Sequence, residues 1–397
     1  MGTTERIKKV AERVIMAKEA GYDVVVAVSA MSGETDRLIN LAKEISAHPN
    51  EREYDMMVST GEQVSIALLA IALHHMGHKA ISMNAFQAGI YTDSSHTKAK
   101  IEKIHSQKIE EKLKDGNIVI VAGFQGIDEH ENVTTLGRGG SDTTAVAVAA
   151  ALHAEKCEIY TDVDGIYTAD PRIVPNASKL KYITYDEMLE LASLGAKVLH
   201  SRSVEFSKKY KVPLEVLTSF SNTEGTIIVE EYQGMEKFVV SGITCKKDEA
   251  KISIIGIPDK PGVAAKVFNA LAVNNINVNM IAQSSLAQDS ALNNISFTIP
   301  LADLKAANQV LESLRQELTP ESIVIDDEIA ILSLVGIGMK SHPGVAAGVF
   351  QVLGEHKVNI EMIGTSEIKI SVVIKKKHSD DMVRLLHEYF KLDKISQ

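Results

Sequence analysis

A glycine-rich loop at residues 134–142 is the stretch of this sequence best suited to bind a small charged molecule. The glycines of this loop are Gly137, Gly139 and Gly140. Because glycine has no side chain, the backbone N–H groups of such a loop can approach a ligand closely. The alanine-rich run that follows predicts a helix with Ser141 or Asp142 as its N-cap. A glycine loop that opens onto a helix N-terminus is a candidate anion site.

Two side chains of the loop add charge to this site. Arg138 presents a planar guanidinium that suits a carboxylate or a phosphate, whereas Asp142 suits an ammonium group or a metal ion. When the loop is considered alone, a simpler interpretation, a glycine turn before a buried helix, is favoured. The neighbouring segments therefore have to decide between the two.

Further polar segments follow predicted strands or begin predicted helices. Residues 29–33 follow the apolar run 24–28. Residues 59–62 (Ser-Thr-Gly-Glu) begin a helix, and a simple cap is the favoured interpretation of this tetrapeptide when it is considered alone. Residues 162–172 follow a strand at 158–161 and contain aspartates, a tyrosine and an arginine. Open α/β sheets bind ligands at the carboxyl ends of their strands, so these segments are candidates for one site.

The elements that would position these segments alternate between helices and strands. An amphipathic helix is predicted at 4–20, followed by a strand at 24–28 that is apolar on both faces, as in a parallel sheet between helix layers. Another helix is predicted over about 61–75, a charged helix over 98–115 and a buried strand over 118–122. An α/β/α sandwich is the architecture that this order favours.

Composition narrows the classes of function. At 397 residues with a formal net charge of −10, the chain is expected to form two or three domains and not to bind nucleic acid or an anionic membrane as its main partner. The two cysteines are far apart and suit a reducing cytoplasm, and no membrane span is predicted. His74, His75 and His78 lie at a helix end, where histidine also suits the helix dipole, so no metal site is predicted.

The C-terminal part is an internal repeat. Residues 261–265 (Pro-Gly-Val-Ala-Ala) return at 343–347, an offset of 343 − 261 = 82. Asn277 and Met280 return at the same offset as Asn359 and Met362. Each copy predicts a compact βαββαβ unit without a cluster of catalytic side chains, which indicates small ligand-binding or pairing modules.

Five motifs occur in a fixed order: Ser-Ala-Met-Ser-Gly at 29–33, Ser-Thr-Gly-Glu at 59–62, Gly-Arg-Gly-Gly-Ser-Asp at 137–142, Thr-Asp-Val-Asp-Gly-Ile-Tyr at 161–167 and Gly-Ala-Lys-Val-Leu-His at 195–200. Together they resemble aspartate kinase, and the repeat resembles the paired ACT domains of its regulated forms. The resemblance covers nearly the whole chain. It implies an amino-acid-kinase-like α/β/α sandwich at 1–232, followed by two ferredoxin-like βαββαβ ACT domains at 233–315 and 316–397.

The resemblance also implies a reaction and a set of roles. The reaction is transfer of the ATP γ-phosphoryl group to the side-chain carboxylate of L-aspartate, the first step of lysine, threonine and methionine biosynthesis. Arg138 would bind the substrate α-carboxylate, Glu62 and Asp142 its α-ammonium, Thr60 would also contact substrate, and Ser29 would line the phosphoryl-transfer site. Residues implied to hold ATP, with Mg²⁺ bridging its phosphates, are Thr161, Asp162, Tyr167, Arg172 and Lys197.

Regulation is expected at the first ACT copy. Polar groups suited to a free amino acid are Asp259, Gly262, Asn277 and Gln283. Lysine, threonine or both are the expected effectors, and pairing of ACT domains would give a homodimer or a higher homo-oligomer.

One departure from the family concerns the beginning of the chain. The family opens with a strand and a Lys-x-Gly-Gly loop, whereas this chain begins with Met1 and Gly2 just after that point. We therefore expect the natural protein to extend upstream through such a strand and loop. Two alternatives stay open: another carboxylate kinase of the same fold, and a catalytically silent amino-acid sensor.

Overall fold

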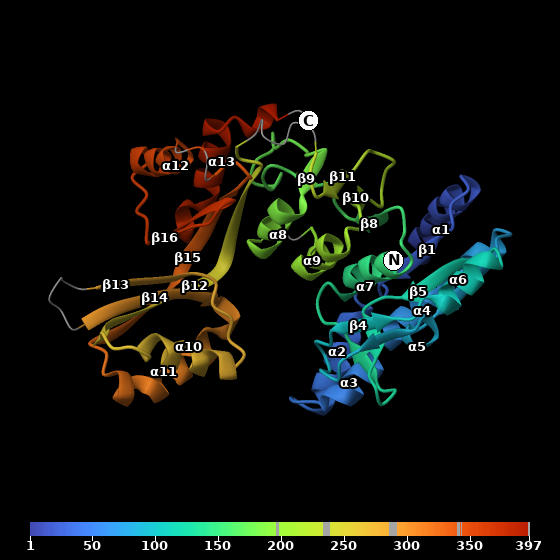
Figure 1. Cartoon of the computed structure of the whole chain (residues 1–397), viewed down its shortest axis with the longest axis horizontal. Coiled ribbons are helices and arrows are strands. Elements are labelled where there is room, and N and C mark those ends of the chain that lie inside the picture. Colours follow the sequence, from blue (N-terminus) through green and yellow to red (C-terminus); the bar gives the residue numbers. More distant parts are fainter. Residues whose placement is uncertain (196–197, 233–238, 286–291, 340–341, 343, 396–397) are drawn as a thin grey trace. The chain divides into compact units, whose positions relative to one another are not determined.

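The structure of the chain is a computed structural model that describes residues 1–195, 198–232, 239–285, 292–339, 342 and 344–395. The chain divides into two units, each built from separate stretches of sequence (Figure 1). The first unit contains Met1–Ile166, Lys181–Ala192 and Lys197–Tyr232. The second unit contains Tyr167–Leu180, Ser193–Ala196 and Gln233–Gln397.

The central sheet of the first unit is parallel, with the strand order β1-β5-β2. Its strands are β1 (Val25–Val28), β5 (Ile118–Ala122) and β2 (Ala80–Met83). All five residues of β5 are buried, because successive side chains point to opposite faces of the sheet and both faces are covered. Even-numbered residues of β5 pack with α1 (Thr4–Glu19) and α4 (Thr60–His75), and odd-numbered ones with α6 (Gln107–Lys114) and α7 (Gly140–Ala151).

Two smaller sheets complete the first unit. One has the order β8-β10-β11-β9, with β8 (Cys157–Thr161), β10 (Leu214–Thr218), β11 (Thr226–Val229) and β9 (Tyr182–Thr184). The other has the order β4-β3-β6-β7, with β4 (Ile101–Ile104), β3 (Ile90–Thr92), β6 (Gln125–Ile127) and β7 (Val133–Thr135). The remaining helices are α2 (Glu34–Ile45), α3 (Glu51–Val58), α5 (Ala85–Ala88), α8 (Tyr185–Ser193) and α9 (Ser201–Tyr210).

The structure corrects three local predictions. The charged helix predicted over 98–115 is a strand, β4, followed by the shorter helix α6. The helix after the glycine loop begins at Gly140 with Gly139 as its N-cap, so neither Ser141 nor Asp142 caps it. The apolar run of β1 is only partly buried, since β1 pairs with β5 alone among the described strands.

One helical stretch, Glu51–His75, is long and apolar enough by length and composition alone to cross a membrane. Half of its most apolar window is buried inside the structure. Ile66, Leu69 and Leu73 of this stretch pack into the same core as α1 and β5. We therefore interpret it as a core helix, a class that passes the same test of length and composition.

The second unit contains a six-stranded sheet with the order β13-β14-β12-β15-β17-β16. Its strands are β12 (Gly242–Pro258), β13 (Ile281–Ser285), β14 (Leu292–Pro300), β15 (Ser322–Val335), β16 (Met362–Thr365) and β17 (Lys369–Lys375). Its α-helices are α10 (Val263–Val273), α11 (Leu304–Leu318), α12 (Gly344–Glu355) and α13 (Ser379–Tyr389), and short 3₁₀ helices lie at Leu301–Asp303, Lys376–His378 and Leu392–Lys394.

The two copies of the sequence repeat share their longest strands. Residues 242–246 of β12 pair with the end of β15, and residues 251–255 pair with its beginning, with register shifts between the two parts. The fourth and last strand of the second copy is therefore the start of β12, which precedes the first copy in the sequence. Figure 1 shows β12 and β15 as two long neighbouring strands that join the copies. The predicted pair of βαββαβ modules is present, but the modules interlock.

The stretch Tyr167–Leu180 packs within the second unit, although it lies between strands of the first in sequence. The Thr168 hydroxyl lies 2.9 Å from His387 Nε2 of α13, and both side chains are buried. The backbone N–H of Ile243 in β12 donates to the Thr168 carbonyl oxygen at 2.7 Å. Hydrogen bonds from two separate elements therefore anchor this stretch.

Candidate active site

Four segments meet at the carboxyl ends of β1 and β5. The N–H of Gly123, just after β5, donates to the carbonyl oxygen of Val28 at the end of β1 at 3.0 Å. A Cβ on Gly123 would lie 2.8 Å from Ser141 Oγ, so α7 begins against this turn. Gln125 Nε2 donates to the Ser59 carbonyl oxygen at 2.9 Å, which brings the start of α4 to the same edge. The predicted convergence of polar segments at one sheet edge is thus present for these segments.

Glu62 is the most unusual group at this edge. Its side chain is only 2% exposed, and its Oε1 accepts a hydrogen bond from the Ala30 N–H at 3.1 Å. Its Oε2 is buried and has no hydrogen-bond partner among the described residues. Burial raises the pKa of Glu62 from 4.5 to about 7. A buried carboxyl oxygen without a partner is destabilising, and a strongly raised pKa is typical of a functional site.

Asp142 is a second carboxyl with a raised pKa. It lies in the first turn of α7, and burial raises its pKa from 3.8 to about 6. A cation bound beside such groups would favour their ionised forms and lower both pKa values. The starts of α4 and α7 therefore bring two carboxyl groups that lack compensating positive charge to one sheet edge.

The glycine loop presents Arg138 to solvent. Arg138 is exposed and forms no hydrogen bond or ion pair with the described part of the chain. Gly139 has φ +69°, and a Cβ there would lie 2.2 Å from His200 Cβ, so the loop packs directly on His200. Burial lowers the pKa of His200, with the charges of Arg202 and Arg138 adding to the effect. The loop therefore rests on a neutral imidazole and leaves its guanidinium available to a ligand.

Arg202 holds the loop from a second side, a role that no sequence motif indicates. Its Nη1 donates to the Leu136 carbonyl oxygen at 2.8 Å, and its Nη2 donates to the Ala99 carbonyl oxygen at 2.6 Å. Leu136 lies 66 residues before Arg202 in the chain. Both acceptors are backbone carbonyl oxygens, which every residue type carries. The side chains of Leu136 and Ala99 therefore do not indicate that these residues bind Arg202.

Ser29 and Thr60 occupy exposed positions at the same edge. Ser29 directly follows β1. Thr60 begins α4, and its hydroxyl donates to the Met57 carbonyl oxygen at 2.6 Å. Either hydroxyl oxygen can still accept a hydrogen bond from a ligand.

The residues predicted to hold the nucleotide are divided between the two units. Thr161 ends β8 in the first unit, and its hydroxyl donates to Asp162 Oδ1 at 3.1 Å. Tyr167 and Arg172 belong to the second unit. Arg172 donates to both carboxylate oxygens of Asp170, from Nε at 3.0 Å and from Nη2 at 2.7 Å. Lys197 lies outside the described residues.

The predicted effector residues are all exposed and lie in or near the first ACT copy. Asp259 Oδ1 accepts a hydrogen bond from Asn293 Nδ2 at 2.7 Å, which joins the turn after β12 to β14. Gly262 has φ +95° and is the N-cap of α10. Gln283 lies in β13 next to β14, and Asn277 lies just before β13. Asp259 and Gln283 are thus both close in structure to β14.

Comparison with known proteins places the chain in a family. Residues 1–218 match the model of the amino acid kinase family, and residues 252–314 and 332–390 match an ACT domain model. The first match covers more than half of the chain. The chain therefore belongs to the amino acid kinase family and carries ACT domains in its C-terminal part.

The relatives narrow the class further. The aspartate kinase of Pseudomonas putida is 53% identical over 99% of this chain and 95% of its own length. The crystal structure of aspartate kinase from Synechocystis is 43% identical, covers 98% of this chain and 68% of that chain, and has a TM-score of 0.54. E. coli aspartokinase III is 24% identical and has the same fold, with TM-scores of 0.80 for its complex with aspartate and ADP and 0.74 for its complex with lysine and aspartate, over at least 96% of each chain.

Within its family the chain is thus one of the aspartate kinases. Its activity is transfer of the ATP γ-phosphoryl group to the side-chain carboxylate of L-aspartate, with ACT domains as the regulatory part. This assignment confirms the α/β/α sandwich with two ACT domains and the reaction that the sequence motifs predicted. The roles of individual residues stay predictions.

Proposed function

We propose that L-aspartate binds at the edge formed by the carboxyl ends of β1 and β5, with its α-carboxylate on Arg138 and its α-ammonium between Glu62 and Asp142. The unpartnered buried oxygen of Glu62 is the observation that supports this arrangement most strongly. An ammonium group carries three donors and a positive charge, so it would satisfy that oxygen and offset the burial of the carboxyl. The exposed guanidinium of Arg138 matches a carboxylate through two parallel N–H···O hydrogen bonds.

In the proposed reaction, a side-chain carboxylate oxygen of aspartate attacks the γ-phosphorus of ATP. The bond from that phosphorus to the β,γ-bridging oxygen breaks, and ADP leaves. The attacking carboxylate is already ionised at neutral pH, so the chain need not supply a general base. Its contribution is to orient the two reactants and to neutralise charge. Thr60 would assist in orienting aspartate, and Ser29 would line the path of the phosphoryl group.

The proposed nucleotide contacts are Thr161, Asp162, Tyr167, Arg172 and Lys197. Mg²⁺, when bound, would neutralise charge on the ATP phosphates, and it often binds through phosphates and water with few protein carboxylates. Among the described residues there is no group of three or more His, Cys, Asp or Glu side chains that could hold a metal ion.

Aspartate specificity is tested by an ADP-release assay with a panel of carboxylates. With the enzyme, Mg²⁺ and ATP, we expect release with L-aspartate and at least a 100-fold lower kcat/KM with L-glutamate and N-acetylglutamate. In L-glutamate the longer side chain would move the reacting carboxylate away from the phosphoryl group while the α-groups stay bound. N-acetylglutamate also lacks the α-ammonium that Glu62 and Asp142 are proposed to bind. Faster release with either longer substrate would support another carboxylate kinase, and amino-acid binding without any release would support a sensor.

The proposed regulation is inhibition by lysine, threonine or both at the first ACT copy, through Asp259, Gly262, Asn277 and Gln283. E. coli aspartokinase III, which shares the fold, has been crystallised with lysine and aspartate. A homo-oligomer formed through the ACT sheet is also proposed, because Ile281 and Ile363, at equivalent repeat positions on the edge strands β13 and β16, are 57% and 49% exposed. Such apolar side chains on unpaired edges favour association.

The effector site is tested with Asp259→Ala. Loss of this carboxylate should weaken inhibition by about 5- to 150-fold in effector concentration, the range of a coupling energy of 1–3 kcal/mol, while activity without effector is retained. Asp303→Ala, a change of another first-copy aspartate near the surface, is the matched control. Inhibition curves that are equal for wild type and Asp259→Ala would contradict the assignment of Asp259.

The proposed compartment is the cytoplasm. Both cysteines are free thiols, with Cys157 buried and Cys245 partly buried, and burial raises the pKa of the Cys245 thiol to about 11. Free thiols of this kind are usual in reducing compartments.

A further inference from the structure

We propose that Asp55, for which the sequence motifs imply no role, is a positioning residue that sets the geometry of the aspartate site. It would do so by tying the glycine loop to the helix that leads into Glu62. This inference rests on the proposed binding of aspartate by Arg138 and Glu62.

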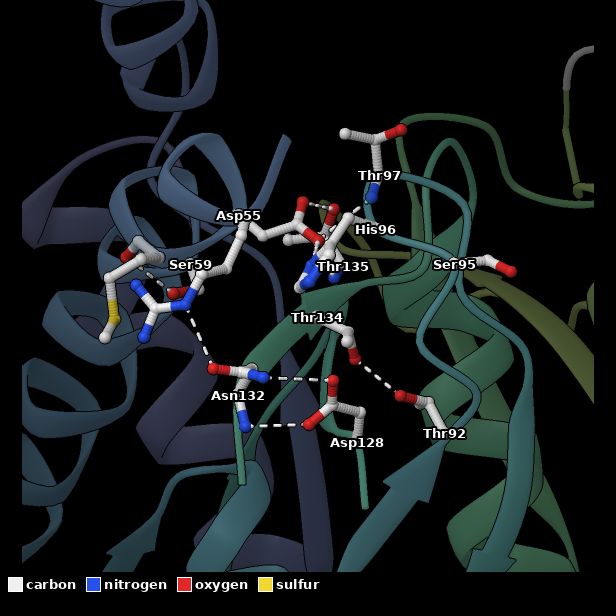
Figure 2. A network of polar contacts seen from close by, with 12 residues as sticks. Asp55, Ser59, Thr92, Ser95, His96, Thr97, Asp128, Asn132, Thr134 and Thr135 are labelled. Atoms are coloured by element: carbon white, nitrogen blue, oxygen red, sulfur yellow. Dashed lines mark hydrogen bonds and ion pairs between the residues drawn. The ribbon is translucent and has the colours of Figure 1, made fainter. Parts of the chain in front are cut away.

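Asp55 is completely buried, with an exposed fraction of 0%. Its Oδ2 accepts hydrogen bonds from the backbone N–H groups of Thr97 at 2.9 Å and Thr135 at 3.0 Å, and lies 2.9 Å from His96 Nδ1. Its Oδ1 accepts a hydrogen bond from the Thr135 hydroxyl at 2.6 Å. Figure 2 shows these groups turned towards the one carboxylate from separate segments of the chain. Hydrogen bonds to a charged acceptor are stronger than neutral ones.

The residues that contact Asp55 lie next to the glycine loop, either in sequence or in space. Thr135 is the last residue of β7 and directly precedes the loop. The N–H of Ala99 donates to the Thr135 carbonyl oxygen at 2.9 Å, so the segment at 97–99 lies along the loop. A Cβ on Gly137 would lie 3.1 Å from the Thr97 carbonyl oxygen. Asp55 thus fixes both the start of the loop and the backbone on which the loop rests.

Asp55 is also close in sequence to Glu62, which is proposed to bind the α-ammonium of aspartate. Asp55 lies in α3, which ends at Val58, and α4 begins at Thr60 after a single residue. Glu62 lies in the first turn of α4. A shift of Asp55 relative to Thr135 would therefore change the spacing between Arg138 and Glu62. That spacing has to match the fixed separation of the two α-groups of an amino acid.

Arg202 independently connects the glycine loop, through Leu136, to the segment at 97–99, through Ala99. The loop therefore keeps one restraint when Asp55 is changed. We expect loss of Asp55 to loosen the geometry of the loop more than to unfold it, which makes the effect measurable in kinetics.

The test is a steady-state comparison of Asp55→Ala with Asp55→Asn in the enzyme. Asp55→Ala should raise the KM for aspartate by roughly 10- to 100-fold, since small displacements of a binding group have effects of this size, and should change the KM for ATP by less than about threefold. Asp55→Asn should recover most of the affinity, because its amide oxygen can accept the bonds that Oδ2 accepts and its amide nitrogen can donate to the Thr135 hydroxyl oxygen. If Asp55→Ala does not fold, Thr135→Val, which removes only the donor to Oδ1, should still raise the KM for aspartate several-fold.

Asp128→Ala is the matched control. Asp128 is also a buried aspartate, 2% exposed, and accepts hydrogen bonds from the N–H groups of His130 and Asn132 in the turn between β6 and β7. It lies in the same network in Figure 2, at the opposite end of β7 from Thr135. Asp128→Ala should lower the melting temperature but leave the KM for aspartate within about twofold of wild type. A purely structural role for Asp55 predicts the same pattern for both variants.

A double-mutant cycle with Arg138→Ala separates this inference from the proposed function. If Asp55 acts through the loop, Asp55→Ala should lower kcat/KM much less in the Arg138→Ala background than in wild type, because residues of one network are not additive. Additive effects, or a rise in KM for ATP equal to that for aspartate, would overturn the role of Asp55. If Arg138→Ala alone changed nothing, the proposed function itself would fail.

Discussion

Arg138→Ala is expected to lower kcat/KM for aspartate by about 30- to 1000-fold, which corresponds to about 2 to 4 kcal/mol of transition-state stabilisation. The physical reason is the loss of a bidentate charged contact to the α-carboxylate. Arg138 lies exposed on the glycine loop. It forms no hydrogen bond or ion pair with the described side chains that would have to break before a ligand binds. Steady-state kinetics of aspartate-dependent ADP release measures the effect.

Two controls define this result. Arg138→Lys should not restore activity, because an ammonium cannot present the planar fork of a guanidinium. Arg315→Ala removes another exposed arginine, one that pairs with Glu312 on the surface of α11, and should leave kcat/KM unchanged. Near-wild-type kcat/KM in Arg138→Ala would show that the α-carboxylate is bound elsewhere.

Glu62→Gln is expected to change stability and activity in opposite directions. Removal of the negative charge that would hold the α-ammonium should lower kcat/KM for aspartate by roughly 30- to several thousand-fold. This corresponds to a loss of about 2 to 5 kcal/mol of transition-state stabilisation. The ligand-free protein should become more stable at pH 8 by about 1 to 3 kcal/mol, since the variant no longer has to bury an ionised carboxyl.

The sign of the stability change follows from the pKa of Glu62. In the unfolded chain this carboxyl ionises near 4.5, whereas burial raises the pKa in the folded protein to about 7. Between these values the unfolded state loses its proton first, so the contribution of Glu62 to stability falls as the pH rises from about 4.5 to 7. Above pH 7 the full penalty, on the order of 3 kcal/mol, is present. Glu62→Gln should remove this pH dependence.

The same pKa predicts the pH profile of catalysis. In the wild-type enzyme, kcat/KM for aspartate should rise as Glu62 ionises near pH 7, because only the carboxylate attracts the ammonium. In Glu62→Gln the rise near pH 7 should disappear, leaving the rise near pH 6 that Asp142 produces. Denaturant melts of both proteins at pH 5 and pH 8, with the kinetic profiles, provide the measurement.

Glu187→Gln is the matched control for Glu62→Gln. Glu187 is equally buried, but its Oε2 accepts hydrogen bonds from the N–H and the hydroxyl of Thr184. Its replacement should destabilise the protein, as expected when a satisfied carboxylate is lost. If Glu62→Gln also destabilised the protein at pH 8, or kept its activity, the unpartnered carboxyl would not be an ammonium site.

The fold was predictable where the sequence pattern is strongest. Residues 118–122 read as a strand apolar on both faces, and β5 is the buried centre of its sheet. The helix predicted over 98–115 failed because residues 101–104 pair with β3, a non-local partner that charge and periodicity do not reveal. The start of α7 was misplaced because Gly139 adopts a left-handed conformation that only glycine adopts readily, and so caps the helix without a side chain.

The candidate site also contains residues that the sequence indicates and residues that it does not. Its exposed groups, such as Arg138, belong to short motifs whose residue types suggest binding chemistry. Its supporting groups, Asp55 and Arg202, act on backbone atoms that lie 42 to 103 residues away in the chain. A backbone N–H or carbonyl group is present at every position, so the sequence carries no mark of such a partner. Only the folded chain reveals that a buried aspartate and the glycine loop are connected.

The anchoring of Tyr167–Leu180 in the second unit limits how this enzyme can be taken apart or recombined. A catalytic fragment that ends after Tyr232 would keep Thr168 but lose His387 and Ile243, leaving the buried hydroxyl and the carbonyl oxygen without these partners. A chimera that exchanged only residues 233–397 for another ACT pair would have to recreate both contacts on a foreign surface. Because Tyr167 and Arg172 lie in this stretch, transferring the anchor with its ACT domains would transfer part of the predicted nucleotide site as well. The kinase and its regulator are therefore expected to be inherited together and not to be exchanged as separate modules.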